Sequence, residues 1–209
     1  MSEDQRPRLD AADPDSVAAC LRRVLTDDAA AVHVMDGADR AAIASEMDGL
    51  TYKRARPQVG EGAKAVTQDF WLTREVPESG AIARARANAE ALVNAALARM
   101  DPPPCPPVRF SEVVAQWYPP STRGISPHRD PKTYTRLVGI LIARGEGDYF
   151  ITNDREGNGA RPVEAPEGSL LLMRQPGFGA ADRQPFHTLR TVHSERRIVT
   201  LRHDSRLDG

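Results

Sequence analysis

The run TRLVGILIARGEGDYFIT, residues 135–152, carries the clearest secondary-structure signal in the chain. It holds two short segments rich in β-branched, aliphatic and aromatic residues, TRLVGILIA (135–143) and DYFIT (148–152), with glycines between them. Segments of this length and composition, bounded by glycine, are typical of β-strands. The run therefore predicts two consecutive strands with no helix between them.

Similar segments lie on both sides of this run. They are separated by Gly, Pro, Asn and Asp clusters, and they read FSEVVAQWY (110–118), SLLLMR (169–174), HTLRTV (187–192) and RRIVTLR (196–202). Several short strands without intervening helices are typical of an antiparallel sandwich or barrel. We therefore expect a β-core over residues 108–204.

The region before this core has a helical pattern. Three helices are expected, over residues 16–26 with Asp15 or Ser16 as the N-cap, from Asp39 to Gly49, and over residues 79–100. The apolar run AAAVHV (29–34) predicts a strand between the first two, and the proline-rich segment 101–107 ends the third. The chain thus reads as one α+β domain over residues 1–209, with a mainly helical framing region at 16–104.

Two segments of this framing region are less regular. Residues 1–15 are charged and contain prolines, so we expect a flexible N-terminus. In the stretch 51–77, Gly60 and Gly62 suggest a loop, whereas QDFWLTREV (68–76) suggests a strand. This stretch could fold over a site as a lid. The segment 152–162 is a second long turn, for which a plain hairpin loop is the simpler interpretation.

Composition narrows the functional class. The net charge is −1, so the chain lacks the bulk basic character of most nucleic-acid-binding domains, although arginines crowd its C-terminal half. Neither a secretory signal nor an apolar run long enough to span a membrane is visible, so a cytoplasmic location is the expectation. Cys20 and Cys105 leave one disulfide open but form no disulfide framework or paired-cysteine zinc site.

The segment SPHRDP, residues 126–131, carries the candidate chemistry. In an extended chain, residues i and i+2 point to the same side, so His128 and Asp130 can face one point. A second histidine on a later strand would complete a facial triad of two histidines and one carboxylate, which leaves positions open on iron(II). Taken alone, an H-x-D pattern is weak evidence, and a loop histidine beside a surface aspartate is an equally good interpretation.

His187, at the head of a later β-run, is the preferred third ligand. His33 lies in the helical region, His193 lies in the turn HSERR, and His203 lies near the C-terminus and could face either way. Arg129, between the first two ligands, should point away from the metal and is expected to be structural.

Arginines on the run RRIVTLR suggest a second feature. Alternation places Arg196, Thr200 and Arg202 on one face and Arg197 on the other. Two arginines on an inward face need anions, because an unpaired buried guanidinium is costly. A dicarboxylate ligand would supply them, with bidentate pairing. Salt bridges to neighbouring strands are the simpler alternative.

These elements together resemble a known family. From Gln116 to Arg202 the chain is similar to the Fe(II)/2-oxoglutarate-dependent oxygenase superfamily, and in particular to its AlkB-like branch. That branch has N-x-Y shortly before H-x-D, then a distal histidine, then R-x5-R. Here the corresponding elements are Gln116-Trp117-Tyr118, His128-Arg129-Asp130, His187 and the run RRIVTLR. The segment EGSLLLMRQPG (167–177) also looks like the strand that precedes the distal histidine in this family.

The resemblance implies a double-stranded β-helix, or jelly-roll, core and an oxidoreductase that uses iron, 2-oxoglutarate and O2. It implies that Arg196 binds the distal carboxylate of 2-oxoglutarate, that Arg202 lies nearer the metal-chelating end, and that Tyr118 offers a hydroxyl. Gln116 stands where the family has asparagine, so its role is open. The short spacing from His187 also leaves Arg197 as an alternative to Arg196.

The substrate stays open at this stage. A dioxygenase that hydroxylates a small molecule, such as an amino acid or natural product, is favoured, and a peptide side chain is a further alternative. An AlkB-type demethylase of nucleic acid would need aromatics for base stacking and cations for phosphates. The candidates for these two roles are Tyr52, Phe70, Trp71 and Trp117, and Lys53, Arg54 and Arg56.

Two readings belong to other classes. A β-sandwich ligand-binding module without chemistry is the non-enzyme hypothesis. A zinc hydrolase is less favoured, because no glutamate is placed by motif as a general base. The oligomeric state has no signal in the sequence.

Overall fold

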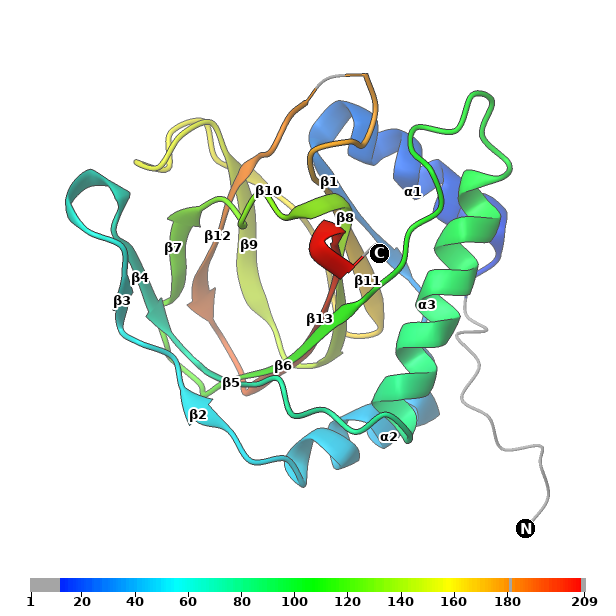
Figure 1. The fold of residues 1–209 in the computed structure, drawn as a ribbon. Helices are drawn as coiled ribbons and strands as arrows, with labels where there is room; N and C mark the ends of the chain where they lie inside the picture. The colour runs from blue at the N-terminus through cyan, green and yellow to red at the C-terminus, as the bar shows by residue number, and fades with distance from the viewer. Residues whose placement is uncertain (1–11, 181, 208–209) are drawn as a thin grey trace, which may run out of the picture.

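The computed structural model describes residues 12–180 and 182–207 (Figure 1). Most of the expected flexible N-terminus therefore lies outside the described residues. The helices are α1 (Pro14–Asp27), α2 (Gly37–Asp48) and α3 (Ala81–Leu97), with short 3-10 turns at Gly62–Lys64 and Ser205–Leu207. The strands are β1 (Ala29–His33), β2 (Lys53–Arg54), β3 (Gln58–Val59), β4 (Val66–Asp69), β5 (Trp71–Thr73), β6 (Glu112–Tyr118), β7 (Gly124–His128), β8 (Tyr134–Arg144), β9 (Gly147–Thr152), β10 (Arg161–Pro162), β11 (Ser169–Arg174), β12 (Phe186–Val192) and β13 (Arg196–Asp204).

The strands form two antiparallel sheets. The seven-stranded sheet has the order β1-β11-β8-β13-β6-β5-β2, and the six-stranded sheet has the order β10-β9-β12-β7-β4-β3. Strands that follow one another in the chain, such as β6 and β7, lie in different sheets, which is the pattern of a jelly roll. The expected α+β fold with a double-stranded β-helix core is therefore confirmed.

The framing region also contributes strands to both sheets. The stretch 51–77 is not a simple loop: β2 and β5 extend the large sheet, whereas β3 and β4 extend the small one. The expected strand over 68–76 is split in two around Phe70, which is buried between the sheets. One segment thus joins the two sheets along one side of the molecule (Figure 1).

The helix ends differ from the expected ones for local reasons. The side chain of Asp13, not of Asp15 or Ser16, caps α1, and it accepts two backbone N–H groups at 2.8 Å. Asp36 caps α2, which therefore begins before Asp39. The carboxylate of Glu46 accepts the backbone N–H of Ala81 and so caps α3 from a neighbouring helix.

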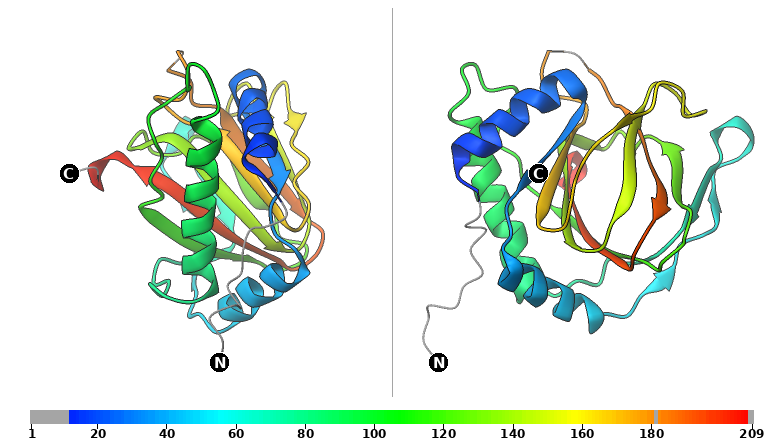
Figure 2. Two further views of the ribbon diagram at one scale, coloured as in Figure 1. Left: turned by 90° about the vertical axis from the view of Figure 1, so that its right-hand side faces the viewer. Right: turned by 180° about the vertical axis from the view of Figure 1, so that it is seen from behind.

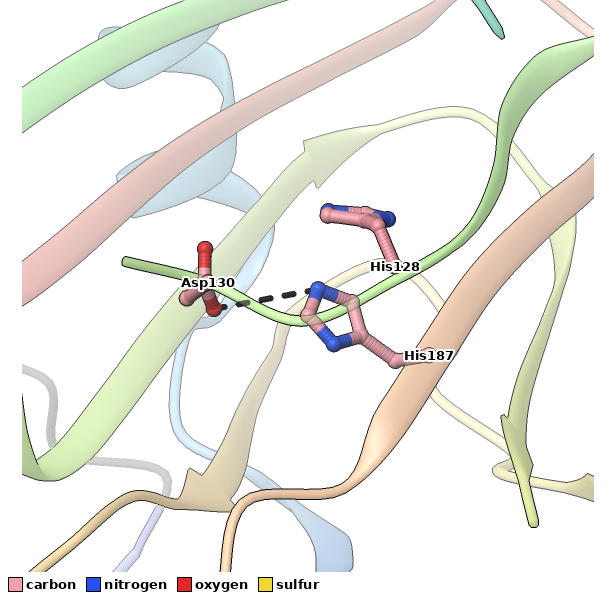
Figure 3. Close-up of side chains that lie close together, drawn as sticks. All are labelled: His128, Asp130 and His187. Atoms are coloured by element: carbon pink, nitrogen blue, oxygen red, sulfur yellow. Dashed lines mark ion pairs between the residues drawn. The ribbon is translucent and has the colours of Figure 1, made fainter. Parts of the chain in front are cut away.

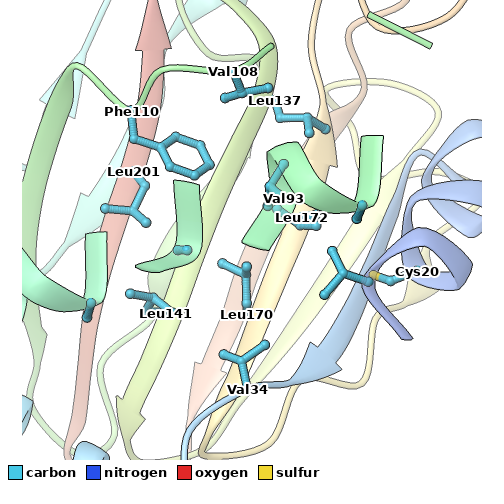
Figure 4. Close-up of a cluster of buried hydrophobic side chains, with 14 of the residues drawn as sticks. Cys20, Val34, Val93, Val108, Phe110, Leu137, Leu141, Leu170, Leu172 and Leu201 are labelled. Carbon is cyan, nitrogen blue, oxygen red and sulfur yellow. The ribbon is translucent and has the colours of Figure 1, made fainter. Parts of the chain in front are cut away.

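The helices cover the outer face of the large sheet (Figure 2). Apolar residues of α1 and α3 pack against outward-facing residues of β8, β11 and β13, and several of these contacts are drawn in Figure 4. The two cysteines, Cys20 and Cys105, lie buried and free at this layer, so the disulfide left open by the sequence does not form. In the part of the chain that is described, no helix is long and apolar enough to cross a membrane.

Leu141 allows a test of this outer core. Its side chain is fully buried in the helix–sheet layer, so Leu141→Ala should lower the free energy of unfolding by about 2–5 kcal/mol. Leu207→Ala is the matched control because Leu207 is 51% exposed, and its effect should stay within about 0.5 kcal/mol. Urea denaturation followed by circular dichroism measures both. Equal effects would contradict the packing described here.

Candidate functional site

The inner faces of the two sheets enclose a triad of metal-ligand type. His128 ends β7 and His187 lies near the start of β12, and the two residues are direct cross-strand partners. Asp130 follows His128 by two residues, and its Oδ2 atom lies 3.7 Å from Nε2 of His187. One ligand atom from each of the three lies within 4.8 Å of the others (Figure 3). The structure thus brings together the three residues that the sequence selects.

Hydrogen bonding and burial prepare these side chains to bind a cation. Nδ1 of His128 lies 2.9 Å from the carbonyl oxygen of Ser126, an arrangement in which Nδ1–H donates and Nε2 is free for a metal. Burial lowers the pKa of His187 to about 3, so its imidazole is neutral at pH 7. Burial alone would raise the pKa of Asp130, yet that pKa lies below its ordinary value because the Arg202 guanidinium lies beside it, with Nε 3.9 Å from Oδ1. Two neutral imidazoles and one carboxylate are a donor set that suits iron(II).

Two glutamines that the sequence reasoning missed support Asp130. Gln184 donates from Nε2 to the backbone carbonyl of Asp130 at 2.7 Å and to Oε1 of Gln175 at 2.8 Å. Nε2 of Gln175 lies 3.5 Å from Oδ2 of Asp130, and Gln175 is fully buried. The pair anchors the segment that carries the carboxylate, as outer-shell partners commonly do at metal sites.

Arg196 lies in the same cavity as the triad, and its side chain is almost wholly buried. It donates to the carbonyl oxygen of Gly145 at 3.2 Å, but no carboxylate of the described residues lies within ion-pair distance. Burial lowers the pKa of Arg196, and the nearby Tyr118 and Tyr149 partly offset this decrease. A buried guanidinium without a carboxylate is costly, and it marks a place where a bound anion would be stabilised.

Two tyrosines face Arg196. Burial raises the pKa of both Tyr118 and Tyr149, so their hydroxyls stay protonated and can donate hydrogen bonds. The hydroxyl of Tyr149 donates to Sδ of Met173, a weak acceptor, at 3.4 Å. The ring of Tyr149 also stacks on His187, with centroids 6.0 Å apart, and it thereby links the arginine to the triad. The sequence selects Tyr118 but not Tyr149, whose alternation with Ile151 on DYFIT is the signal that could have found it.

The other arginines of β13 have protein partners. Arg197 points to the outer face, where it pairs with Asp48 at 2.9 Å and packs over the ring of Trp117. Arg202 faces the cavity, but Nη1 is 2.9 Å from Glu112 and Nε is 3.9 Å from Asp130. Salt bridges within the protein, the simpler alternative to a bound anion, therefore account for Arg197 and, in part, for Arg202. They do not account for Arg196.

Gln116 also faces the cavity. Its Oε1 accepts from the hydroxyl of Thr200 at 2.6 Å, and its Nε2 donates to the hydroxyl of Tyr118 at 3.3 Å. Both contacts are buried, and they fix the position of the tyrosine hydroxyl near Arg196.

The remaining candidate residues lie elsewhere. His33 lies at the exposed end of β1, His193 pairs with Asp148 at the surface, and His203 is buried and accepts from the backbone N–H of Arg109. Of the four candidate base-stacking aromatics, Phe70 alone lines the cavity, and it stacks on Tyr118. The other three, Tyr52, Trp71 and Trp117, pack together on the outer side of β5 and β6.

A single cavity of about 680 Å³ contains all of these inward-facing groups. The triad lies at its wall between β7 and β12, and Arg196 lies on the opposite sheet. Residues of β2 to β5 form another wall. The volume is large enough for a small dicarboxylate together with a second organic molecule.

Comparison with solved structures places this architecture among known folds. The chain aligns with a prolyl hydroxylase from Trichoplax adhaerens, solved with a hypoxia inducible factor peptide, at TM-score 0.63 and 11% identity over 92% of this chain and 91% of that one. A Pseudomonas putida prolyl-4-hydroxylase aligns at TM-score 0.64 and 17% identity, over 90% of this chain and 98% of that one. A 2OG-Fe(II) oxygenase family protein from Burkholderia pseudomallei aligns at TM-score 0.62 and 12% identity, over 95% of this chain and 93% of that one.

These similarities establish the fold. No protein-family model matches the sequence, and no curated protein matches it either. A shared fold does not determine a shared activity, so the function depends on the side chains of the site.

Proposed function

We propose that the protein is an Fe(II)- and 2-oxoglutarate-dependent dioxygenase that hydroxylates a small molecule. The observation that carries this proposal is the presence, in one cavity, of a two-histidine, one-carboxylate triad and a buried arginine that has no carboxylate partner among residues 12–180 and 182–207. A metal triad alone suits many reactions, and a lone arginine suits many anions. Their combination on the two facing sheets suits a metal-chelating dicarboxylate.

Each group has a defined role in this proposal. His128, Asp130 and His187 would hold the iron, a ligand set that leaves further positions for 2-oxoglutarate and O2. Arg196 pairs with the distal carboxylate of 2-oxoglutarate, and the Tyr118 and Tyr149 hydroxyls donate hydrogen bonds to it. When bound, iron and 2-oxoglutarate supply oxidative decarboxylation to succinate and carbon dioxide, coupled to hydroxylation of a C–H bond of the substrate.

Two further side chains position these groups. Gln116 holds the Tyr118 hydroxyl through the contacts described above. Arg202 lies beside Asp130 and Glu112, so it stabilises the ionised carboxylate of the triad at the metal-binding end of the cavity. Apolar residues such as Ile140, Met173 and Leu189 line the cavity and limit the access of water.

The aromatic residues favour a small-molecule substrate over a nucleic acid. A demethylase of nucleic acid would stack an extruded base on cavity aromatics, yet Phe70 is already stacked on Tyr118 and the other candidates face outward. An AlkB-like branch assignment therefore stays a prediction. The peptide in the Trichoplax structure makes a peptide side chain the next alternative.

The segment 51–77 is proposed to shape substrate choice, because residues from Lys53 to Arg74 line the cavity. Gly60 and Gly62 have positive φ angles, 79° and 53°, in the connection between β3 and β4. A lid that closes over the substrate would move at this connection.

The proposed function is tested by anaerobic addition of Fe(II) and 2-oxoglutarate to the apo-protein. We expect the weak visible charge-transfer band of a 2-oxoglutarate chelate on iron, and succinate formation on exposure to oxygen. Absence of the band despite a folded protein would contradict the oxygenase proposal and favour the binding-module hypothesis.

A further inference from the structure

Positive charge is concentrated in the cavity. Its described lining includes one carboxylate, that of Asp130, and seven cationic side chains, which are Lys53, Arg54, Arg56, Arg74, Arg129, Arg196 and Arg202. The whole chain has a net charge of −1, so this excess is local and is not a consequence of composition. Like charges gathered in a concave site raise the local potential and attract ligands of opposite charge.

Three of the seven cations have other roles. Arg196 is proposed to bind 2-oxoglutarate, and Arg202 contacts Glu112 and Asp130. Arg54 pairs with Asp69 at 3.3 Å and packs over Trp71 on the outer side of the sheet. The other four cations, Lys53, Arg56, Arg74 and Arg129, are here named the basic rim.

The protein itself supplies little negative charge to the basic rim. Arg56 and Arg129 make no ion pair with any carboxylate in the described ranges. Arg74 lies 3.2 Å from Glu112, but Glu112 is shared with the more deeply buried Arg202. Lys53 approaches Glu75 at 3.8 Å with both side chains 83% exposed, where ion pairs contribute little.

The basic rim faces the cavity from two sides. Lys53 pairs in register with Leu72 of β5, which lines the cavity, and Arg74, directly after the end of β5, also lines it. Arg129 lies between two triad residues and lines the cavity, while its exposed guanidinium packs 4.1 Å from the ring centroid of Phe186, which lines a neighbouring cavity. The four cations therefore line the same cavity as the triad.

We propose that the substrate is a small organic anion whose carboxylate or phosphate group is bound by the basic rim while its target C–H bond faces the metal. This inference rests on the proposed function, because it assumes that Arg196 is occupied by 2-oxoglutarate. Arginine pairs with both kinds of anion in a bidentate manner, so the shared chemistry is a compact group of negative oxygens. The cavity volume of about 680 Å³ favours a small molecule over a polymer.

The test uses methyl phosphate and acetate as probes. Each is titrated by calorimetry into the anaerobic complex with Fe(II) and 2-oxoglutarate, and separately into the metal-free protein with 2-oxoglutarate. We expect binding that weakens about tenfold in the double variant Arg56→Gln/Arg74→Gln, because two exposed ion pairs of modest strength are lost together. Arg84→Gln is the control, because Arg84 is exposed on α3 on the helical side.

The outcomes separate this inference from the proposed function. Equal affinity in the wild type and the double variant, or no binding of either probe although the charge-transfer band forms, would overturn the anion site. Binding to the metal-free protein that depends on the basic rim, without any band, would support the anion site and contradict the oxygenase proposal. A short oligothymidylate that binds far more tightly than methyl phosphate would overturn the small-molecule assignment. Preference between the two probes identifies phosphate or carboxylate.

Discussion

His187→Ala is expected to abolish both the charge-transfer band and succinate formation. His187 supplies one of three ligand atoms, and Asp130 Oδ2 lies only 3.7 Å from its Nε2. Loss of an outer-shell partner alone costs about 10–100-fold in metal affinity, so loss of a ligand should cost at least 100-fold. Competition against a chromophoric chelator measures Fe(II) affinity, and coupled succinate detection measures turnover.

His193→Ala is the matched control for this experiment. His193 follows the same strand but lies at the surface, with its ring nitrogen 2.8 Å from Asp148, so iron affinity and turnover should stay within a factor of about two. Circular dichroism checks that both variants are folded. Iron affinity that is unchanged in folded His187→Ala would rule out the triad proposed here.

Alternation along short segments made half of this site predictable. His128 and Asp130 are two residues apart in an extended chain, and Arg196 and Arg202 share a face of one strand. Parity also separates Arg196 from Arg197, which the structure places on opposite faces of the sheet. Such local periodicity needs no knowledge of how distant strands pair.

Contacts between distant strands could not be predicted in the same way. The cross-strand register of His128 with His187 joins segments 59 residues apart, and hydrophobic patterning alone does not specify that register. Gln175 and Gln184 lie in the connection between β11 and β12. Their contacts with Asp130 depend on the path of that connection. Glutamine has no spacing signature that would mark it for such a role.

The framing region shows the same limit. Its helices have local signals, but the Glu46 carboxylate that caps α3 comes from another helix. The stretch 51–77 appeared irregular because β2 to β5 are only two to four residues long and belong to two different sheets. Strands this short are fixed by their partners and not by their own propensity.

Arg196→Gln is expected to weaken 2-oxoglutarate binding by a factor of about 30 or more while the metal site stays intact. Truncating one partner of a buried, hydrogen-bonded charge pair costs about 2–5 kcal/mol. Arg196 is only 2% exposed, so the ion pair with the bound carboxylate would form largely shielded from solvent. The dissociation constant is measured from the charge-transfer band under anaerobic conditions, with Fe(II) affinity determined separately.

Arg197→Gln on the same strand is the control. It distinguishes Arg196 from Arg197 as the residue that binds the distal carboxylate of 2-oxoglutarate. Its guanidinium pairs with Asp48 on the outer face, so the variant should lose some stability and keep its affinity for 2-oxoglutarate. In Arg196→Gln the opposite pattern is expected, because removal of a buried cation without a carboxylate relieves a desolvation cost in the apo-protein. A loss of 2-oxoglutarate affinity in Arg197→Gln, but not in Arg196→Gln, would transfer the anion-binding role to Arg197. Since that side chain does not line the cavity, the described arrangement of β13 would then have to be wrong.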